Sequence, residues 1–270
     1  MPCSLPSETL IQQIVSSEND YMYDRMLAIQ SKPGNPEGVE LRRFGNALCI
    51  YSRTMPWPSF NTVKGLTAAD GEFIDPIIEF YKTKGRKPQF ELVPSFADQH
   101  VLARLAERGF FQSGFHTSLH LSEPQTPHID EMDGITVKEL QEDEFMTYAM
   151  IHCRGTGLSD DGIPYVAENN KVLYGRPGWK FYLAYVKEEP AAAGVMYIKD
   201  SIASFTFAAT LPQFRNRGLQ QRLLHRRIAE ASRQGCKLAV GQCAFLSQSH
   251  RNMERAGMKT AYVRTSWTVR

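Results

Sequence analysis

The stretch Thr210-Leu211-Pro212-Gln213-Phe214-Arg215-Asn216-Arg217-Gly218-Leu219-Gln220 joins two segments of different pattern. The apolar run over 202–210 predicts a buried strand, and apolar residues spaced by three and four predict a helix over 219–234. A helix N-terminus offers unpaired backbone N–H groups and partial positive charge, which suit a pyrophosphate. Gly218 allows a close backbone approach, and Arg215 and Arg217 add full positive charge. The stretch therefore predicts a pyrophosphate-binding loop.

The helix that follows is strongly basic. Between Arg215 and Arg233 there are six arginines and His225 against the single acid Glu230. A solvated basic helix face behind a turn glycine is the alternative interpretation. A nucleic-acid interface is a further one, but the net charge of +2 and the lack of interleaved aromatic residues argue against it. We therefore expect no nucleic-acid partner.

The elements around the loop restrict the fold. Strands expected over 179–186, 191–198 and 202–210 are separated by short turns, which predicts an antiparallel meander. A strand at 134–140 and a helix at 143–152 precede them, with a polar stretch over 154–178. A strand at 236–245, a short helix at 247–256 and a last strand at 261–269 come after the basic helix. This order excludes P-loop and dinucleotide-binding folds, which need parallel strand–helix–strand units and other glycine spacings.

In this context the loop resembles the acetyl-CoA loop of the GNAT superfamily of N-acetyltransferases. Arg215-Asn216-Arg217-Gly218-Leu219-Gln220 follows Thr210-Leu211-Pro212 as the family motif follows its strand, with Gln220 where Gly or Ala is usual. The segment from Ser249 and Asn252 to Ala256-Gly257-Met258 is similar to the family's later helix. The resemblance covers most of 133–270 and implies a mixed α+β fold. Its sheet would be mostly antiparallel, flanked by helices, and splayed between its fourth and fifth strands.

The same resemblance implies which residues bind acetyl-CoA, and it implies no metal. Backbone groups of Ala208, Ala209 and Thr210 would bind the pantetheine and the acetyl carbonyl. The residues of the loop would hold the pyrophosphate, and two residues of the later helix would border the thiol; these are Arg215, Asn216, Arg217, Gly218, Leu219 and Gln220, and Ser249 and Asn252.

The catalytic residues are less well marked. Many family members place a tyrosine acid where this sequence has Met253, which cannot donate a proton. Tyr262 on the last strand and His250 are the candidates, with a core tyrosine and an exposed helix histidine as the alternatives. Four more titratable residues lie in the segment expected to line the acceptor pocket, each also readable as a surface residue: His152, Asp160, Asp161 and Glu168. Positioning and a water relay could serve without a dedicated acid.

The N-terminal half reads as a degenerate copy of the same fold. A proline-containing linker at 124–132 separates a domain at 1–123 from one at 133–270, and a faint internal repeat relates the two. The counterpart of the loop, 63–67, lacks arginines, and Asp70, Glu72 and Asp75 crowd the next helix start. We therefore expect two GNAT-like domains, of which the first does not bind CoA; a scaffold without ligand contact is equally open. This half begins with two expected helices, 7–17 and 20–30.

Bulk properties set the remaining expectations. Five scattered cysteines without CxxC spacing, no signal sequence and no long apolar run predict a cytoplasmic protein with no membrane partner. The expected function is transfer of the acetyl group of acetyl-CoA to an amine, by default on a small molecule. A CoA-binding regulator or interaction module without turnover is the alternative.

Overall fold

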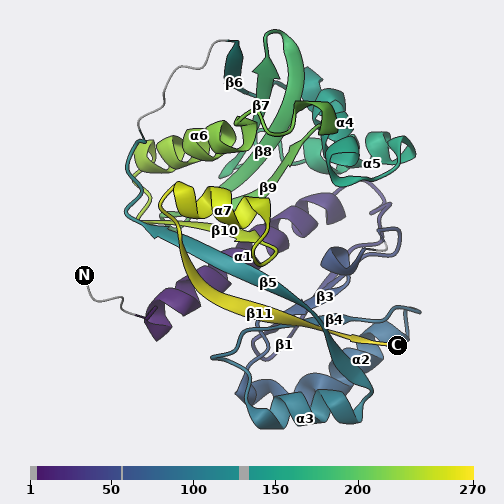
Figure 1. The fold of residues 1–270 in the computed structure, drawn as a ribbon. Coiled ribbons are helices and arrows are strands. Elements are labelled where there is room, and N and C mark those ends of the chain that lie inside the picture. The colour runs from purple at the N-terminus through teal and green to yellow at the C-terminus, as the bar shows by residue number, and fades with distance from the viewer. Residues whose placement is uncertain (1–4, 56, 128–133) are drawn as a thin grey trace. The chain divides into compact units, whose positions relative to one another are not determined.

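The computed structural model describes residues 5–55, 57–127 and 134–270 (Figure 1). The part of the predicted linker at 128–132 lies outside these ranges, as does Cys3. By contacts the chain divides into two compact units. Unit 1 comprises Met1–Ser118, Cys243–Phe245 and Thr260–Arg270, and unit 2 comprises Leu119–Gln242 and Leu246–Lys259. The fold is α+β, with a mostly antiparallel sheet flanked by helices, as the sequence predicts.

Unit 1 is built on strands in the order β1-β2-β3-β4-β11-β5. All five residues of β2 are buried, as expected of a strand covered on both faces. One face packs on α2 and α3 through a core that includes Cys49, Ile77 and Leu105. The elements are α1 (Glu8–Gln30), β1 (Glu40–Phe44), β2 (Ala47–Tyr51), β3 (Thr62–Lys64), α2 (Ile74–Lys82), β4 (Gln89–Leu92), α3 (Gln99–Glu107), β5 (Phe110–Ser122) and β11 (Lys259–Val269).

The first helix differs from its prediction. The sequence predicts two helices, whereas α1 is a single helix of 23 residues with Ser7 as its N-cap. The interruption between the two predicted helices falls at Glu18 and Asn19. In the structure Glu18 is 3% exposed and paired, so the helix continues through it.

The last strand forms where the sequence predicts one, and it lies between β4 and β5, which are far from it in the sequence. Thr265 is opposite Leu92 and Trp267 is opposite Phe90 in an antiparallel ladder. Residues from both ends of the chain therefore build unit 1.

Arg264 of β11 lies in a buried ionic network. Its Nη1 is 2.5 Å from Glu18 Oε2 and 3.4 Å from Glu91 Oε2. Lys64 pairs with the same Glu91 carboxylate. Two acids and two bases thus balance within the core, where an unpaired charge would cost several kcal/mol. Burial raises the pKa of Glu91, but Lys64 and Arg264 outweigh it and lower this pKa to about 2.

We expect Glu91→Gln to lower the free energy of unfolding at pH 7 by about 3 kcal/mol, because two buried cations lose a partner. The Glu91 pKa is lower folded than unfolded, so its stabilisation is present above its ordinary value of 4.5 and is lost as the pH falls toward 2. Denaturant titrations should therefore give a gap between variant and wild type that shrinks below pH 4.5. An unchanged gap at pH 3 would contradict the assignment. Exposed Glu79→Gln is the control, expected within about 0.5 kcal/mol of wild type.

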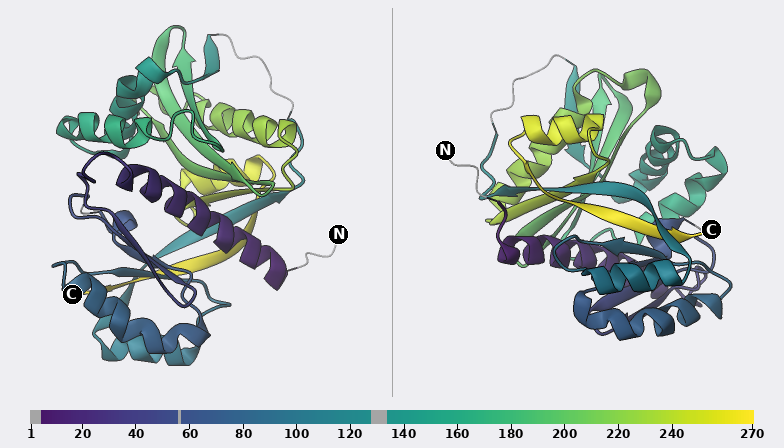
Figure 2. Two further views of the ribbon diagram at one scale, coloured as in Figure 1. Left: turned by 180° about the vertical axis from the view of Figure 1, so that it is seen from behind. Right: turned by 60° about the horizontal axis from the view of Figure 1, so that its bottom comes forward.

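Unit 2 carries strands in the order β10-β9-β8-β7-β6, with β7, β8 and β9 in the predicted meander. Helix α6 packs on β8 and β9 from one face and α4 from the other (Figures 1 and 2). The elements are β6 (Ile135–Glu139), α4 (Phe145–Thr156), α5 (Ile163–Lys171), β7 (Trp179–Val186), β8 (Glu189–Lys199), β9 (Ile202–Thr210), α6 (Leu219–Arg233), β10 (Leu238–Cys243) and α7 (Gln248–Arg255).

The sheet of unit 2 opens between β9 and β10. These strands are parallel and paired from Leu238 opposite Ile202 to Gly241 opposite Phe205. Residues 206–210 of β9 continue without a β10 partner. This separation is the splay that the sequence predicts between the fourth and fifth strands. It leaves one edge of β9 free for another hydrogen-bonding partner.

Candidate functional site

The predicted loop connects the free end of β9 to α6. Leu211 and Phe214 are buried, and the Leu211 N–H donates to the Ala191 carbonyl at 2.9 Å. A short 3-10 turn, Pro212–Phe214, follows. These apolar anchors leave Arg215 to Gly218 exposed at the surface.

The loop turns into α6 through two residues in the left-handed region. Asn216 has φ 63° and Gly218 has φ 76°. Gly218 stands at the N-cap position, where no side chain caps the helix. The first N–H groups of α6 are therefore not capped by a side chain, which is the arrangement that binds anions at helix N-termini.

A cleft of about 920 Å³ lies at this end of α6. Ten of the eleven residues predicted to bind acetyl-CoA line it, and the structure brings them together from β9, the loop, α6 and α7. Its lining includes two arginines and no acidic residue, so the cleft suits an anion. The ten are Ala208, Ala209, Thr210, Arg215, Asn216, Gly218, Leu219, Gln220, Ser249 and Asn252.

The two arginines of the loop have different positions. Arg215 lines the cleft, and its Nη2 donates to the Gly155 carbonyl at the end of α4 at 3.0 Å. Arg217 is not among the lining residues and lies over the Phe214 ring, 5.4 Å from its centroid. Gly155 also lines the cleft; a Cβ there would stand 2.9 Å from that of Ala209. Nothing in the sequence marks Gly155 as a cleft residue.

Gln220, which stands where the GNAT motif usually has Gly or Ala, lines the cleft. Its Nε2 donates to the Thr210 hydroxyl at 2.8 Å, which ties the start of α6 to the end of β9. The side chain lies along the wall, and the cleft stays open beside it. Arg255 of α7 also lines the cleft, although the sequence did not single it out.

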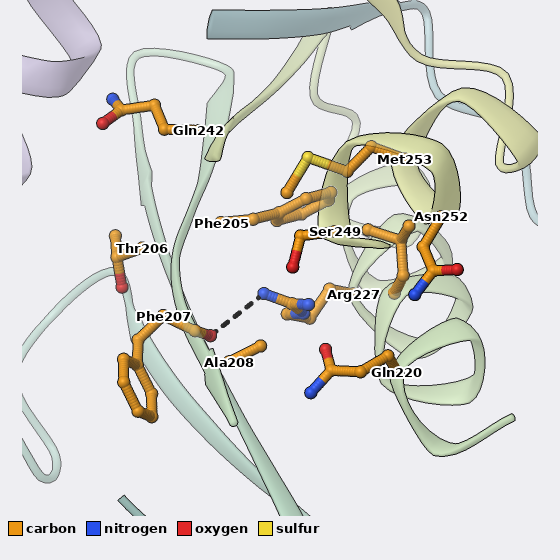
Figure 3. A pocket seen from close by; sticks show the side chains of 11 residues that line it. Phe205, Thr206, Phe207, Ala208, Gln220, Arg227, Gln242, Ser249, Asn252 and Met253 are labelled. Atoms are coloured by element: carbon orange, nitrogen blue, oxygen red, sulfur yellow. Dashed lines mark hydrogen bonds between the residues drawn. The ribbon is translucent and has the colours of Figure 1, made fainter. Parts of the chain in front are cut away.

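A second, smaller cavity of about 80 Å³ continues inward and is called the inner pocket here (Figure 3). Ala208, Gln220, Ser249 and Asn252 line both cavities, so the two adjoin. The inner pocket is also lined by residues 205–207 of β9, and hence lies where β9 leaves β10.

The sequence candidates for catalysis have structural partners. His250 is 3% exposed rather than exposed, and its Nδ1 accepts the Leu246 N–H at 3.0 Å. Tyr262 is buried in unit 1, where its hydroxyl lies 3.5 Å from Glu18 Oε1. Neither is among the residues that line the cleft or the inner pocket. Met253 lines the inner pocket, and its side chain packs against Gly241.

His152 is the titratable residue of unit 2 whose surroundings fit a base. Its ring stacks on Phe207 of β9 with centroids 4.0 Å apart. The Tyr148 hydroxyl donates to Asn170 Oδ1 at 3.4 Å and lies 3.3 Å from His152 Nδ1. Which nitrogen of His152 carries the proton depends on the tautomer of the ring. By contrast Asp160, Asp161 and Glu168 are exposed, as their surface interpretation had it.

Solved structures with this arrangement cover nearly the whole chain. A GCN5-related N-acetyltransferase from Kribbella flavida aligns with a TM-score of 0.65 and 14% identity, over 95% of this chain and 94% of its own. One from Sphaerobacter thermophilus aligns with a TM-score of 0.61 and 12% identity, over 96% and 90%. The chain has the fold of the GNAT acetyltransferases.

The likeness extends to a two-domain member of the group. A tandem GNAT protein from the clavulanic acid biosynthesis pathway aligns with a TM-score of 0.60 and 13% identity, over 98% of this chain and 96% of its own. At these identities the comparisons establish the GNAT fold alone. No protein-family model matches the sequence. No curated protein matches it either.

The loop at 63–67, which the sequence predicts to be the counterpart of the CoA loop, ends next to a buried carboxylate. Asp70 is 2% exposed, and its carboxylate accepts the N–H groups of Asn46 and Thr67 at 3.0 and 2.9 Å. Burial raises the Asp70 pKa, but these hydrogen bonds outweigh it and lower the pKa below its ordinary value. An acidic side chain thus already accepts the Thr67 N–H at the end of this loop.

Three other features of the described residues bear on cofactors, membranes and disulfides. No group of three or more His, Cys, Asp or Glu side chains in this part of the chain could hold a metal ion. None of its helices combines the length and apolar character needed to cross a bilayer. Cys49, Cys153, Cys236 and Cys243 are buried and form no disulfide in the described part of the chain.

Proposed function

We propose that the chain is an acyltransferase that moves the acetyl group of acetyl-CoA to an amine, on a small molecule. The observation that carries this proposal is the cleft at the uncapped N-terminus of α6, next to the splay of β9 and β10, in a GNAT fold. Its anion-binding end suits the pyrophosphate. Its inner end opens where β9 has a free edge.

The residues divide the work of binding by their chemistry. The N–H groups at Gly218, Leu219 and Gln220 would bind the pyrophosphate together with Arg215. The free edge of β9 at 208–210 would pair with the amides of the pantetheine, as an added strand pairs with a sheet edge. Ser249 and Asn252 would border the thiol, since they line both the cleft and the inner pocket.

His152 is the residue we propose as the base. An amine attacks the thioester only when neutral, so a proton must leave it. His152 packs against Phe207 of β9, and a neutral imidazole could accept that proton at its unprotonated nitrogen. Backbone N–H groups of β9 would stabilise the negative charge that develops on the carbonyl oxygen. Met253 offers no proton to the departing thiolate, so a water relay would supply it.

Arg215 and Arg217 form a matched pair for testing the binding site. We expect Arg215→Gln to weaken acetyl-CoA binding about tenfold, because a charge-assisted hydrogen bond to phosphate is lost. Arg217→Gln removes an equal charge outside the cleft lining and should weaken binding about twofold or less. Calorimetric titration of acetyl-CoA into both variants measures the difference. Equal effects would mean that net charge alone, and not the Arg215 position, governs affinity.

Thiol release from acetyl-CoA, measured across a panel of small amines, tests turnover. The proposal predicts acceptor-dependent release of CoA by the full chain. Binding of acetyl-CoA with no release for any amine would instead favour a CoA-binding regulator, for which Met253 packed against Gly241 is the supporting observation. Absence of both binding and release would refute the proposal.

A further inference from the structure

The inner pocket contains a buried charge that acetyl transfer does not use. Arg227 of α6 lines this pocket and is 2% exposed. Figure 3 shows its guanidinium reaching from α6 toward the backbone of Phe207. The side chain stands four residues after Leu223, on the buried stripe of the helix.

Arg227 donates three hydrogen bonds to backbone carbonyls. Its Nε donates to Leu223 O at 3.1 Å, and its Nη1 donates to Val195 O at 3.3 Å and Phe207 O at 3.2 Å. The last two carbonyls adjoin an irregularity in the β8–β9 ladder between Val195 and Tyr197. Arg227 therefore satisfies acceptors near this irregularity.

The hydrogen bonds to these carbonyls do not use the Nη2 atom of Arg227, and they do not require its positive charge. Its Nη2 has no hydrogen-bond partner within residues 5–55, 57–127 and 134–270. No acidic side chain in those ranges pairs with Arg227, and burial lowers its pKa to about 10. The nearest acid on the helix, Glu230, pairs with Lys180 and Arg233. The guanidinium also lies over the Phe205 ring, 4.9 Å from its centroid, and this contact offsets part of the cost of burying the charge. A carboxylate that reached Nη2 would offset more of that cost.

The place of the pocket identifies which anion would reach it. The inner pocket shares four lining residues with the cleft and lies at the splay, so the acyl end of a bound thioester would enter it. About 80 Å³ holds a group of a few heavy atoms and excludes a nucleotide. Ala208, with its short side chain, lines both cavities.

We propose that Arg227 binds the terminal carboxylate of a short dicarboxylic acyl-CoA, such as a malonyl or succinyl thioester. The proposal rests on the proposed function, since it assumes that the cleft takes an acyl-CoA. The free Nη2 donates to the carboxylate while Nη1 keeps its carbonyl partners. Acetyl-CoA would then still serve as an acyl donor, but its acetyl group has no carboxylate to pair with the Arg227 guanidinium.

The test compares acyl groups of equal shape and different charge on the full wild-type chain. Malonyl-CoA and isovaleryl-CoA match in size, and succinyl-CoA matches 4-methylpentanoyl-CoA. We expect at least one charged thioester to bind about tenfold tighter than its neutral counterpart, in calorimetric titrations that also include CoA and acetyl-CoA. This comparison needs no variant, so it holds even where Arg227 substitutions fail to fold.

Two substitutions then locate the effect. Arg227→Gln should bring the charged-to-neutral affinity ratio to about one, whereas Arg226→Gln should leave it unchanged, because Arg226 lies over the Tyr182 ring and lines neither cavity. Equal binding of charged and neutral thioesters by the wild type overturns this proposal alone. Failure of CoA and acetyl-CoA to bind overturns the proposed function as well. A third outcome is also possible for Arg227→Gln: it could lose selectivity for carboxylated amine acceptors and keep its selectivity among acyl-CoA donors. Arg227 would then bind a carboxylate of the acceptor, and this outcome also overturns the proposal.

Discussion

Gly218→Glu is expected to abolish measurable acetyl-CoA binding, with an affinity loss of 100-fold or more. The substitution places a carboxylate at the uncapped N-terminus of α6, where it would take the N–H groups meant for the pyrophosphate and repel its charge. It also puts a side chain at φ 76°, which costs about 1 kcal/mol of stability. Thermal-shift and calorimetric titrations with acetyl-CoA measure the two effects separately.

The control for this change lies at the other end of the same helix. Gly235 also has a positive φ, of 67°, and a Cβ there would meet nothing within 4 Å. Gly235→Glu therefore carries the same backbone strain and the same charge away from the cleft, and it should bind acetyl-CoA like wild type. If Gly218→Glu retained wild-type affinity, the pyrophosphate would have to bind elsewhere.

His152→Ala should lower kcat about 100-fold, the range expected when a general base is removed. Acetyl-CoA affinity should change less than about twofold, because His152 is not among the residues lining the cleft. Steady-state rates with the best amine of the panel, at saturating acetyl-CoA, measure kcat, and calorimetric titration measures the acetyl-CoA affinity.

Two further variants separate catalysis from packing. Tyr148→Phe keeps the ring of Tyr148 and removes the hydroxyl near His152 Nδ1, so we expect a smaller loss of kcat, about fivefold. His225→Ala removes a half-buried histidine of α6 that lines neither cavity and should leave kcat unchanged. A wild-type rate in His152→Ala would exclude His152 as the base.

The sequence predicted the parts of the fold that local pattern determines. The strand–loop–helix unit around Gly218 follows from an apolar run, a glycine with the required φ and an amphipathic stripe, all within 33 residues, 202–234. The meander of β7, β8 and β9 follows from its short turns. Such features depend on neighbours in the chain, and these predictions are confirmed.

Features that depend on distant residues were missed. A break between two helices was predicted at Glu18, whose partner Arg264 stands 246 residues away. Helix α5 was assigned to an irregular stretch because its buried positions include Asn169 and Asn170, which read as polar surface. His250 was expected to be exposed, yet the backbone N–H of Leu246 holds it in the core.

The position of Arg227 in its helix indicated from the sequence that this residue is buried, but the count of basic residues did not distinguish it from the other arginines. Among six arginines it was grouped with a solvated basic face. Its spacing of four from Leu223 and its neighbour Ile228 place it on the buried stripe, and the structure buries it. An arginine at an apolar position of an amphipathic helix should thus be considered separately from the exposed basic residues around it.

A structure of the full chain crystallised with acetyl-CoA tests the central claim most directly. We expect one molecule per chain, with its pyrophosphate at the N–H groups of Gly218 to Gln220 and its pantetheine along residues 208–210 of β9. We expect none at the loop 63–67, where the Asp70 carboxylate already accepts the Thr67 N–H. Density for the pyrophosphate at that loop, or anywhere other than the start of α6, would contradict the account.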